Sequence, residues 1–290
     1  MSKEKVILFD TTLRDGQQTQ GVDFSVQDKV NIAKALDNIG IDYIEGGWPG
    51  ANPTDTKFFE QNIKFSNAKF TAFGMTKRSG RSADNDPQLR SLIDAHSDSI
   101  CLVAKTWDFH VDLALGISLE ENIEAIKDSV LSIKENNKES LIDCEHFFDG
   151  FKSNPEFSFK CIEAALESGA EWVVLCDTNG GTLPNEIFQI VGEITRKFSG
   201  DKIGIHCHND TENAVANSLA AIDAGVRHLQ GTINGLGERC GNANLISIIP
   251  TLLLKKEYSE KYDISIDVEK LSELKNLSRL VDDILNKHPN

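Results

Sequence analysis

Three polar clusters, far apart in the sequence, contain the residue types that hold a divalent metal ion. They are Leu13-Arg14-Asp15-Gly16-Gln17, His206-Cys207-His208-Asn209-Asp210 and Gly237-Glu238-Arg239-Cys240-Gly241-Asn242. Each follows a short apolar run typical of a β-strand. These runs are Val6 to Phe9, Ile203 to Ile205 and Leu229 to Ile233. If they are neighbouring strands of one barrel, the clusters meet at its mouth.

The two histidines of the second cluster have the spacing of a metal site on a strand. His206 and His208 are two residues apart, so their side chains point to the same side while Cys207 points to the other. In a closed barrel the first strand pairs with the eighth, which in turn neighbours the seventh strand with its two histidines. Asp15, just after the first strand, can therefore reach both imidazoles, and Asn242, in the loop after the eighth strand, lies between Asp15 and the histidines. Two imidazoles, a carboxylate and an amide oxygen suit Mn²⁺, Mg²⁺, Zn²⁺ or Co²⁺, without distinguishing among them. The alternative is a hydrogen-bonded polar strand end.

Composition narrows the class of protein. The chain has 290 residues and a formal net charge of −15, which disfavours nucleic acid as a partner. No apolar run reaches the roughly 18 residues of a membrane span, and the start of the chain lacks a signal-peptide core, so we expect a cytoplasmic protein. The six cysteines stand singly, without a Cys-x-x-Cys pair, and we expect them to be reduced.

Strand-like and helix-like segments alternate along the chain. The predicted strands are 6–10, 43–47, 70–74, 99–104, 141–145, 172–177, 202–208 and 228–233. The predicted helices are 25–39, 55–63, 87–95, 119–135, 155–168, 184–198, 213–224 and 244–254. Eight such repeats favour a closed (β/α)8 TIM barrel, an α/β fold, over an open doubly wound sheet, because no Gly-x-Gly-x-x-Gly follows the first strand. We therefore expect a catalytic barrel over residues 1–257 and a short C-terminal helical extension over 258–290.

The three clusters resemble the signatures of a known enzyme family. Phe9 to Gln17, His206 to Asp210 and Gly235 to Asn242 are similar to the motifs of the DRE-TIM metallolyases, over roughly residues 5–255. This family includes the 2-isopropylmalate, homocitrate and citramalate synthases, hydroxymethylglutaryl-CoA lyase and biotin-dependent carboxyltransferases. Further segments resemble citramalate synthases in particular. These are Glu45 to Pro53, Glu145 to Gly150 and Cys176 to Thr182.

The resemblance implies an acyltransferase that joins acetyl-CoA to an α-keto acid in a metal-dependent Claisen condensation. Pyruvate would give citramalate, an intermediate of isoleucine and thus branched-chain amino acid biosynthesis. It implies that Asp15, His206, His208 and Asn242 hold the divalent metal ion, and that Gln18 binds substrate.

Three further residues have roles for which a structural alternative stays open. Arg14 can stabilise the developing oxyanion and bind substrate, or form a rim ion pair. Thr178 can donate a hydroxyl to the keto acid's carboxylate, as the resemblance implies, or serve in a turn. Glu145 can transfer a proton, or form a structural salt bridge.

The C-terminal segment leads to a further expectation. A helical apolar stripe from Leu271 to Leu285 must be buried against the barrel or against a partner, which makes a homodimer an expected assembly. Relatives in this family continue into a linker with a histidine and a tyrosine, and then into an amino-acid-sensing domain. Because the sequence stops at Asn290, we expect a catalytic-barrel fragment, weak or inactive in condensation.

Four alternative functions remain open from the sequence. They are 2-isopropylmalate or homocitrate synthesis, acyl-CoA cleavage by a lyase of the same family, metal-dependent hydrolysis, and keto-acid binding without catalysis. A hydrolase barrel typically carries its His-x-His pair on the first strand, whereas here the pair follows the seventh. Product formation from acetyl-CoA and a keto acid separates the other three.

Overall fold

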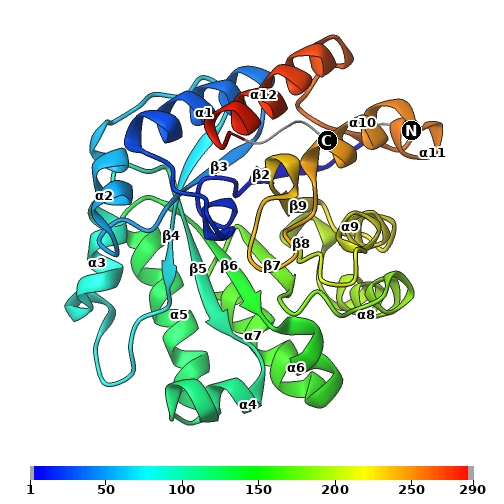
Figure 1. The fold of residues 1–290 in the computed structure, drawn as a ribbon. Helices are drawn as coiled ribbons and strands as arrows, with labels where there is room; N and C mark the ends of the chain where they lie inside the picture. The colour runs from blue at the N-terminus through cyan, green and yellow to red at the C-terminus, as the bar shows by residue number, and fades with distance from the viewer. Residues whose placement is uncertain (1–2, 287–290) are drawn as a thin grey trace.

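Eight parallel strands close into a barrel in a computed structural model that describes residues 3–286. The strands are β2 (Ile7–Asp10), β3 (Tyr43–Gly47), β4 (Lys69–Met75), β5 (Ser99–Lys105), β6 (Glu139–Glu145), β7 (Trp172–Asp177), β8 (Ile203–Cys207) and β9 (His228–Gly231). β9 pairs in parallel with β2, so the last strand closes the barrel against the first (Figure 1). The predicted α/β barrel is confirmed.

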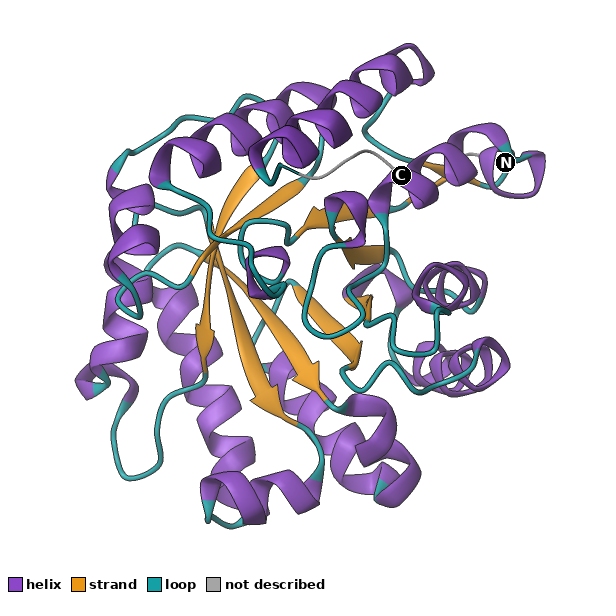
Figure 2. Cartoon of the chain, in the orientation of Figure 1, coloured by secondary structure: helices purple, strands orange, loops and turns teal. Residues whose placement is uncertain are grey.

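Helices form a ring outside the strands (Figure 2). The helices are α1 (Val26–Ile39), α2 (Pro53–Glu60), α3 (Pro87–Asp94), α4 (Asp108–His110), α5 (Leu119–Glu135), α6 (Phe147–Ser153), α7 (Pro155–Glu167), α8 (Pro184–Lys197), α9 (Ala214–Asp223), α10 (Leu245–Leu254), α11 (Lys256–Ser259) and α12 (Leu271–Ile284). All eight predicted helices are present, and α5 has the predicted bounds. Ser25 caps α1 in a reciprocal capping box with Asp28, and Gly40 ends that helix with φ 98°.

Five helices and strands were not predicted, and the last barrel strand is two residues shorter than expected. α4 and α6 lie after strands β5 and β6, α11 follows α10, and β1 (Glu4–Lys5) pairs with β10 (Tyr262–Asp263) outside the barrel. β9 ends at Gly231 rather than at residue 233, because the chain turns into a short 3-10 helix, η5 (Ile233–Gly235), with Asn234 at φ 59°. This turn starts the loop that carries the third polar cluster.

Apolar and aromatic side chains fill the barrel interior, whereas its mouth, at the carboxyl ends of the strands, is polar. The interior residues that pack together are Phe9, Tyr43, Phe73, Cys101, Leu141 and Trp172. The larger apolar cluster lies between the strands and the surrounding helices. A filled interior is general for this architecture, in which function lies at the carboxyl ends of the strands. That is the end at which Asp15 and His208 follow β2 and β8.

The C-terminal apolar stripe packs inside the same chain. α12 lies beside α1 (Figure 1), and its Leu274, Leu277 and Val281 are buried. The stripe therefore no longer argues for a homodimer, which stays a prediction, as does the domain division at residue 257. All six cysteines are free. Within residues 3–286, no helix has the length and apolar character needed to cross a membrane; the cytoplasmic location stays a prediction.

Candidate metal centre

The loop after β2 directs Arg14 and Asp15 into the barrel mouth. Asp10, the last residue of β2, accepts hydrogen bonds from the backbone N–H and the hydroxyl of Thr12, which tightens the turn. The Asp15 N–H then donates to the carbonyl of Thr11 at 2.9 Å. Thr12 and Asp10 are fully buried, so this turn is rigidly held where β2 ends.

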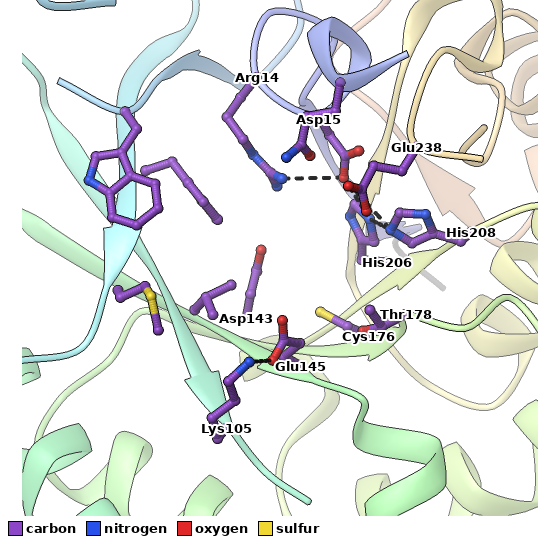
Figure 3. Close-up of a pocket in the computed structure, with 15 residues that line it drawn as sticks. Arg14, Asp15, Lys105, Asp143, Glu145, Cys176, Thr178, His206, His208 and Glu238 are labelled. Carbon is purple, nitrogen blue, oxygen red and sulfur yellow. Dashed lines mark hydrogen bonds and ion pairs between the residues drawn. The ribbon is translucent and has the colours of Figure 1, made fainter. Parts of the chain in front are cut away.

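Asp15, His206 and His208 meet at one point, as predicted (Figure 3). Asp15 Oδ2 lies 3.3 Å from His206 Nε2 and 3.8 Å from His208 Nε2. The two Nε2 atoms are 3.3 Å apart. All three side chains are at most 7% exposed. Cys207 points away into the apolar cluster between strands and helices, as the strand alternation requires.

Asn242, the fourth predicted metal ligand, is linked to the cluster through its backbone. It forms an isolated antiparallel bridge with His208 and is 2% exposed, but it does not line the cavity described below. Its Oδ1 has no hydrogen-bond partner, and neither have Asp15 Oδ1 and His208 Nδ1. Unpaired buried polar atoms are costly. A carboxylate and two imidazoles that meet at one buried point, with further buried polar atoms unpaired on the same residues, fit a divalent cation.

The pKa values of these groups are set by burial and by one another. Burial alone would raise the pKa of Asp15, but the Arg14 guanidinium and the His206 ring outweigh it and hold that pKa well below its usual range. Burial and the neighbouring His206 lower the pKa of His208 to about 3, so its ring is neutral and can offer a lone pair. Burial opposes a charge on His206, yet the hydrogen bond to Asp15 raises its pKa.

Arg14 lies between Asp15 of the candidate metal centre and the buried Glu45. Its Nε donates to Glu45 Oε2 at 2.7 Å, and its Nη1 lies 3.3 Å from Asp15 Oδ2. The guanidinium carbon is 3.9 Å from the ring centre of Phe73. Glu45 also accepts a hydrogen bond from Thr11. Arg14 is thus aimed into the mouth rather than spread on the rim, and its geometry is fixed on two sides.

A cavity of about 290 Å³ opens beside this cluster (Figure 3). It is lined by Arg14, Asp15, Gln18, Trp48, Phe73, Met75, Val103, Lys105, Asp143, Glu145, Cys176, Thr178, His206, His208 and Glu238. Seven of the eight predicted site residues therefore line one cavity, and Asn242 is the exception. Figure 3 shows Arg14 and Asp15 on one side and Lys105 and Glu145 on the other.

Thr178 and Glu145 already have partners. The Thr178 hydroxyl oxygen accepts from the backbone N–H of His146 at 2.8 Å, which leaves its proton free to be donated into the cavity. Glu145 forms an ion pair with Lys105. The structural salt bridge, one of the two roles considered for Glu145 from the sequence, is therefore present. Glu145 also lines the cavity, where the other role, proton transfer, would take place.

Three buried polar residues at the site were missed by the sequence reasoning. Glu45 holds Arg14, and Gln230 bridges His206 and Asp143. Glu45, Asp143 and Gln230 lie on strands β3, β6 and β9, and each is at most 3% exposed. A polar residue between two non-polar neighbours in a strand was the available signal, but its partner follows from the neighbouring strands and not from the local sequence.

Comparisons with known proteins agree with one another. The sequence profile of the HMGL-like family matches residues 5–278. An (R)-citramalate synthase from Aquifex aeolicus is 52% identical over 98% of this chain and 53% of its own length. One from Geobacter sulfurreducens gives the same three values. A 2-isopropylmalate synthase from Sulfolobus acidocaldarius is 33% identical over 87% of the chain and 63% of its own length.

The chain spans about half the length of the citramalate synthases that it matches. Among solved structures, the HMG-CoA lyase from Brucella melitensis superimposes with a TM-score of 0.80 at 15% identity, over 98% of this chain and 100% of the lyase. At that identity the likeness shows the fold alone.

Proposed function

The chain belongs to the HMGL-like family, and from that membership we propose that it catalyses the condensation of acetyl-CoA with an α-keto acid, preferably pyruvate to give citramalate. The family predicted from the three motifs is confirmed. The observation that carries the proposed activity is the buried Asp15–His206–His208 cluster beside Arg14.

The residues that would hold the metal ion are Asp15, His206 and His208, with the amide oxygen of Asn242 as a fourth donor. When bound, a divalent ion supplies a Lewis acid for the keto oxygen and a template for the keto acid. Mixed nitrogen and oxygen donors suit Mn²⁺, Mg²⁺, Zn²⁺ or Co²⁺. The identity of the ion is left to measurement.

Arg14 and Thr178 would orient the keto acid. The Arg14 guanidinium, fixed by Glu45 and Asp15, presents a permanent positive charge where the keto oxygen becomes an alkoxide. The free hydroxyl proton of Thr178 can be donated to the keto acid's carboxylate. Gln18 lines the same cavity and offers an amide to the remaining carboxylate oxygen.

Glu145 would accept or return a proton during the reaction. The acetyl-CoA methyl loses a proton, and the resulting carbanion forms a carbon–carbon bond with the keto carbon. The alkoxide then takes up a proton, and water cleaves the thioester to release CoA. Glu145 lies at the cavity with Lys105 beside it, so this pair can hold a proton during the cycle.

The cavity favours a small keto acid. Its wall beside Arg14 is formed by the apolar atoms of Phe73, Met75 and Val103, which fit a methyl group. Its volume of about 290 Å³ is at the lower end of ligand pockets, which is roughly 300 Å³. Pyruvate is therefore the preferred substrate over the branched 2-oxoisovalerate, in agreement with the citramalate synthases among the relatives.

The test is thiol detection of free CoA after mixing the chain with acetyl-CoA, Mn²⁺ and pyruvate, 2-oxoisovalerate or 2-oxoglutarate. We expect weak release with pyruvate, in line with a catalytic-barrel fragment, that EDTA abolishes and that Asp15→Asn removes. Pyruvate binding is measured in parallel by calorimetry, with and without Mn²⁺. A lyase would release no CoA from this mixture. Faster turnover of 2-oxoisovalerate would overturn the substrate assignment, and the absence of both turnover and Mn²⁺-dependent binding would overturn the function.

A further inference from the structure

Gln230 connects the candidate metal centre to the opposite wall of the cavity. It lies on β9, is fully buried, and is the register partner of His206 on β8. Its Oε1 lies 2.8 Å from His206 Nδ1, and its Nε2 donates to Asp143 Oδ1 at 2.9 Å. Asp143 lines the cavity from β6. The oxygen and the nitrogen of the Gln230 amide thus each have a hydrogen-bond partner inside the barrel.

The direction of this amide follows from the chemistry of its neighbours. The NH₂ group of Gln230 faces Asp143 Oδ1 and donates to it. The amide oxygen then faces His206, and an oxygen can only accept. His206 Nδ1 must therefore carry a proton, so Nε2 is the ring atom that would offer a lone pair to a bound metal ion, in place of its hydrogen bond to Asp15. That atom is the one 3.3 Å from Asp15 Oδ2.

We propose that Gln230 is a positioning residue that selects the metal-binding tautomer of His206 and fixes the plane of its ring. The proposal rests on the metal centre of the proposed function. Acceptors that orient metal-binding histidines in this way commonly contribute a factor of about 10–100 in metal affinity. Asp143 has the supporting role, because its charge sets the direction of the Gln230 amide.

A second buried histidine, on the strand of Gln230, has no hydrogen-bond partner that would select its tautomer. His228 lies two residues before Gln230 on the same interior face, and neither of its ring nitrogens has a hydrogen-bond partner. It packs among Phe9, Tyr43 and Trp172. No neighbour selects a tautomer of His228. At His206, by contrast, the Gln230 oxygen faces the ring Nδ1, and the Gln230 nitrogen faces Asp143.

Gln230→Met tests the proposal because methionine keeps the shape of the side chain and removes both hydrogen bonds. We expect Mn²⁺, titrated by electron paramagnetic resonance, to bind about 10–100-fold more weakly. Thr71→Val is the matched control: Thr71 is buried in the barrel interior and loses one hydrogen bond, to Ser99 at 2.7 Å, away from the cavity. It should bind Mn²⁺ as the wild type does.

Two further measurements separate positioning from simple stability. Gln230→Glu keeps an acceptor for His206 Nδ1–H and should recover most of the affinity lost in Gln230→Met. In ¹⁵N-histidine spectra of the Zn²⁺-loaded wild type, a slowly exchanging Nδ1–H resonance is expected from His206, and it should be lost in Gln230→Met. A merely structural role would move the unfolding midpoint without changing this resonance.

The role of Asp143 is tested by a double-mutant cycle. Asp143→Asn removes a negative charge and weakens Mn²⁺ binding directly in any background. Its additional effect through the amide should appear with Gln230 and be absent from the Gln230→Met background. Equal effects in both backgrounds would remove Asp143 from the proposal. Wild-type Mn²⁺ affinity in Gln230→Met would overturn the proposal alone, whereas a wild type that binds no Mn²⁺ would overturn the proposed function as well.

Discussion

Arg14 is useful to the proposed reaction because two acidic partners fix a planar, forked cation. Glu45 and Asp15 each hold a different part of the guanidinium, and Phe73 lies against its face. A lysine at this position would keep the charge but could not contact both acids in the same geometry. The orientation of the positive charge, rather than its presence, is therefore the property to test.

Arg14→Lys should reduce the rate of CoA release by about 10²–10³, the usual effect of losing one oxyanion donor. The affinity for Mn²⁺ should change little, because Asp15, His206 and His208 remain in place. The measurement is the rate constant for CoA release at saturating pyruvate, with Mn²⁺ affinity as the control. A variant that turns over as fast as the wild type would show that only the charge matters at this position.

His228 makes the stability of the barrel depend on pH. Burial lowers its pKa from 6.5 to about 3, because a charged ring would be surrounded by aromatic side chains without a partner. The unfolded chain binds a proton below about pH 6.5, whereas the folded protein does not until about pH 3. The stability that the neutral ring contributes is therefore present above pH 6.5 and lost as the pH falls towards 3.

His228→Leu should remove this dependence. The wild type should lose on the order of 4 kcal/mol more than the variant between pH 7 and pH 3, at roughly 1.36 kcal/mol per pKa unit. Urea unfolding at a series of pH values measures the difference, and Thr71→Val, an interior change without a titrating group, should follow the wild type. Parallel curves for His228→Leu and the wild type would contradict a depressed pKa.

At the scale of elements, the sequence predicts most boundaries because the periodicity of apolar residues changes from two to 3.6 at each one. β3, β7 and α5 have the predicted bounds. α6 was missed because it begins directly after β6, with His146 at φ 52° as the turning residue. Such a turn has no apolar period. β9 was extended too far because Thr232 and Ile233 are β-branched residues that favour a strand, although the chain turns there into η5.

The candidate site was predictable only in part. Residues that follow strand ends, such as Asp15 and His208, could be predicted because all parallel strands of a barrel end at one mouth. Glu45 and Gln230 could not be assigned roles, because their partners are on other strands and depend on the barrel register. The signal they do give is a polar residue between two non-polar neighbours in a strand.

Lys29 shows how a helix outside the barrel positions the site inside it. It is fully buried on α1, and its Nζ donates to the carbonyls of Leu13 at 2.8 Å and Gly46 at 3.0 Å, and to the Asp55 carboxylate. Leu13 directly precedes Arg14, and Gly46 directly follows Glu45. One ammonium group therefore ties together the ends of two strands that hold the Arg14–Glu45 pair.

Lys29→Met should destabilise the protein by about 3–5 kcal/mol, because it leaves Asp55 as a buried charge without its partner. It should also weaken Mn²⁺ binding by loosening the loop after β2. Lys34→Met, an exposed position on the same helix, is the matched control. Urea unfolding measures both, and replacing Asp55 by leucine in the Lys29→Met background should recover part of the loss. Equal stability of the two single variants would show that Lys29 does not hold these strand ends.

At the scale of the whole molecule, charge predicts the order in which the proposed metal ion and keto acid bind. The protein has a formal net charge of −15. The cavity is acidic as well, since Asp15, Asp143, Glu145 and Glu238 outnumber its basic residues, Arg14 and Lys105. An α-keto acid is an anion, so this lining repels it. A divalent cation between the keto acid and Asp15 would reverse the sign of that interaction.

Pyruvate should therefore bind only after the metal ion. Two unit charges about 4 Å apart interact by about 4 kcal/mol at an effective dielectric constant of about 20, so loss of the cation should weaken pyruvate binding by roughly a thousandfold or more. Calorimetry of pyruvate into EDTA-treated and Mn²⁺-loaded protein measures this. Glu238→Gln, which removes one acid from the lining, should strengthen the metal-free binding only slightly. Comparable pyruvate affinities with EDTA and with Mn²⁺ would mean that Arg14 and Lys105 suffice to hold the anion, and that the cation is not what overcomes the acidic lining.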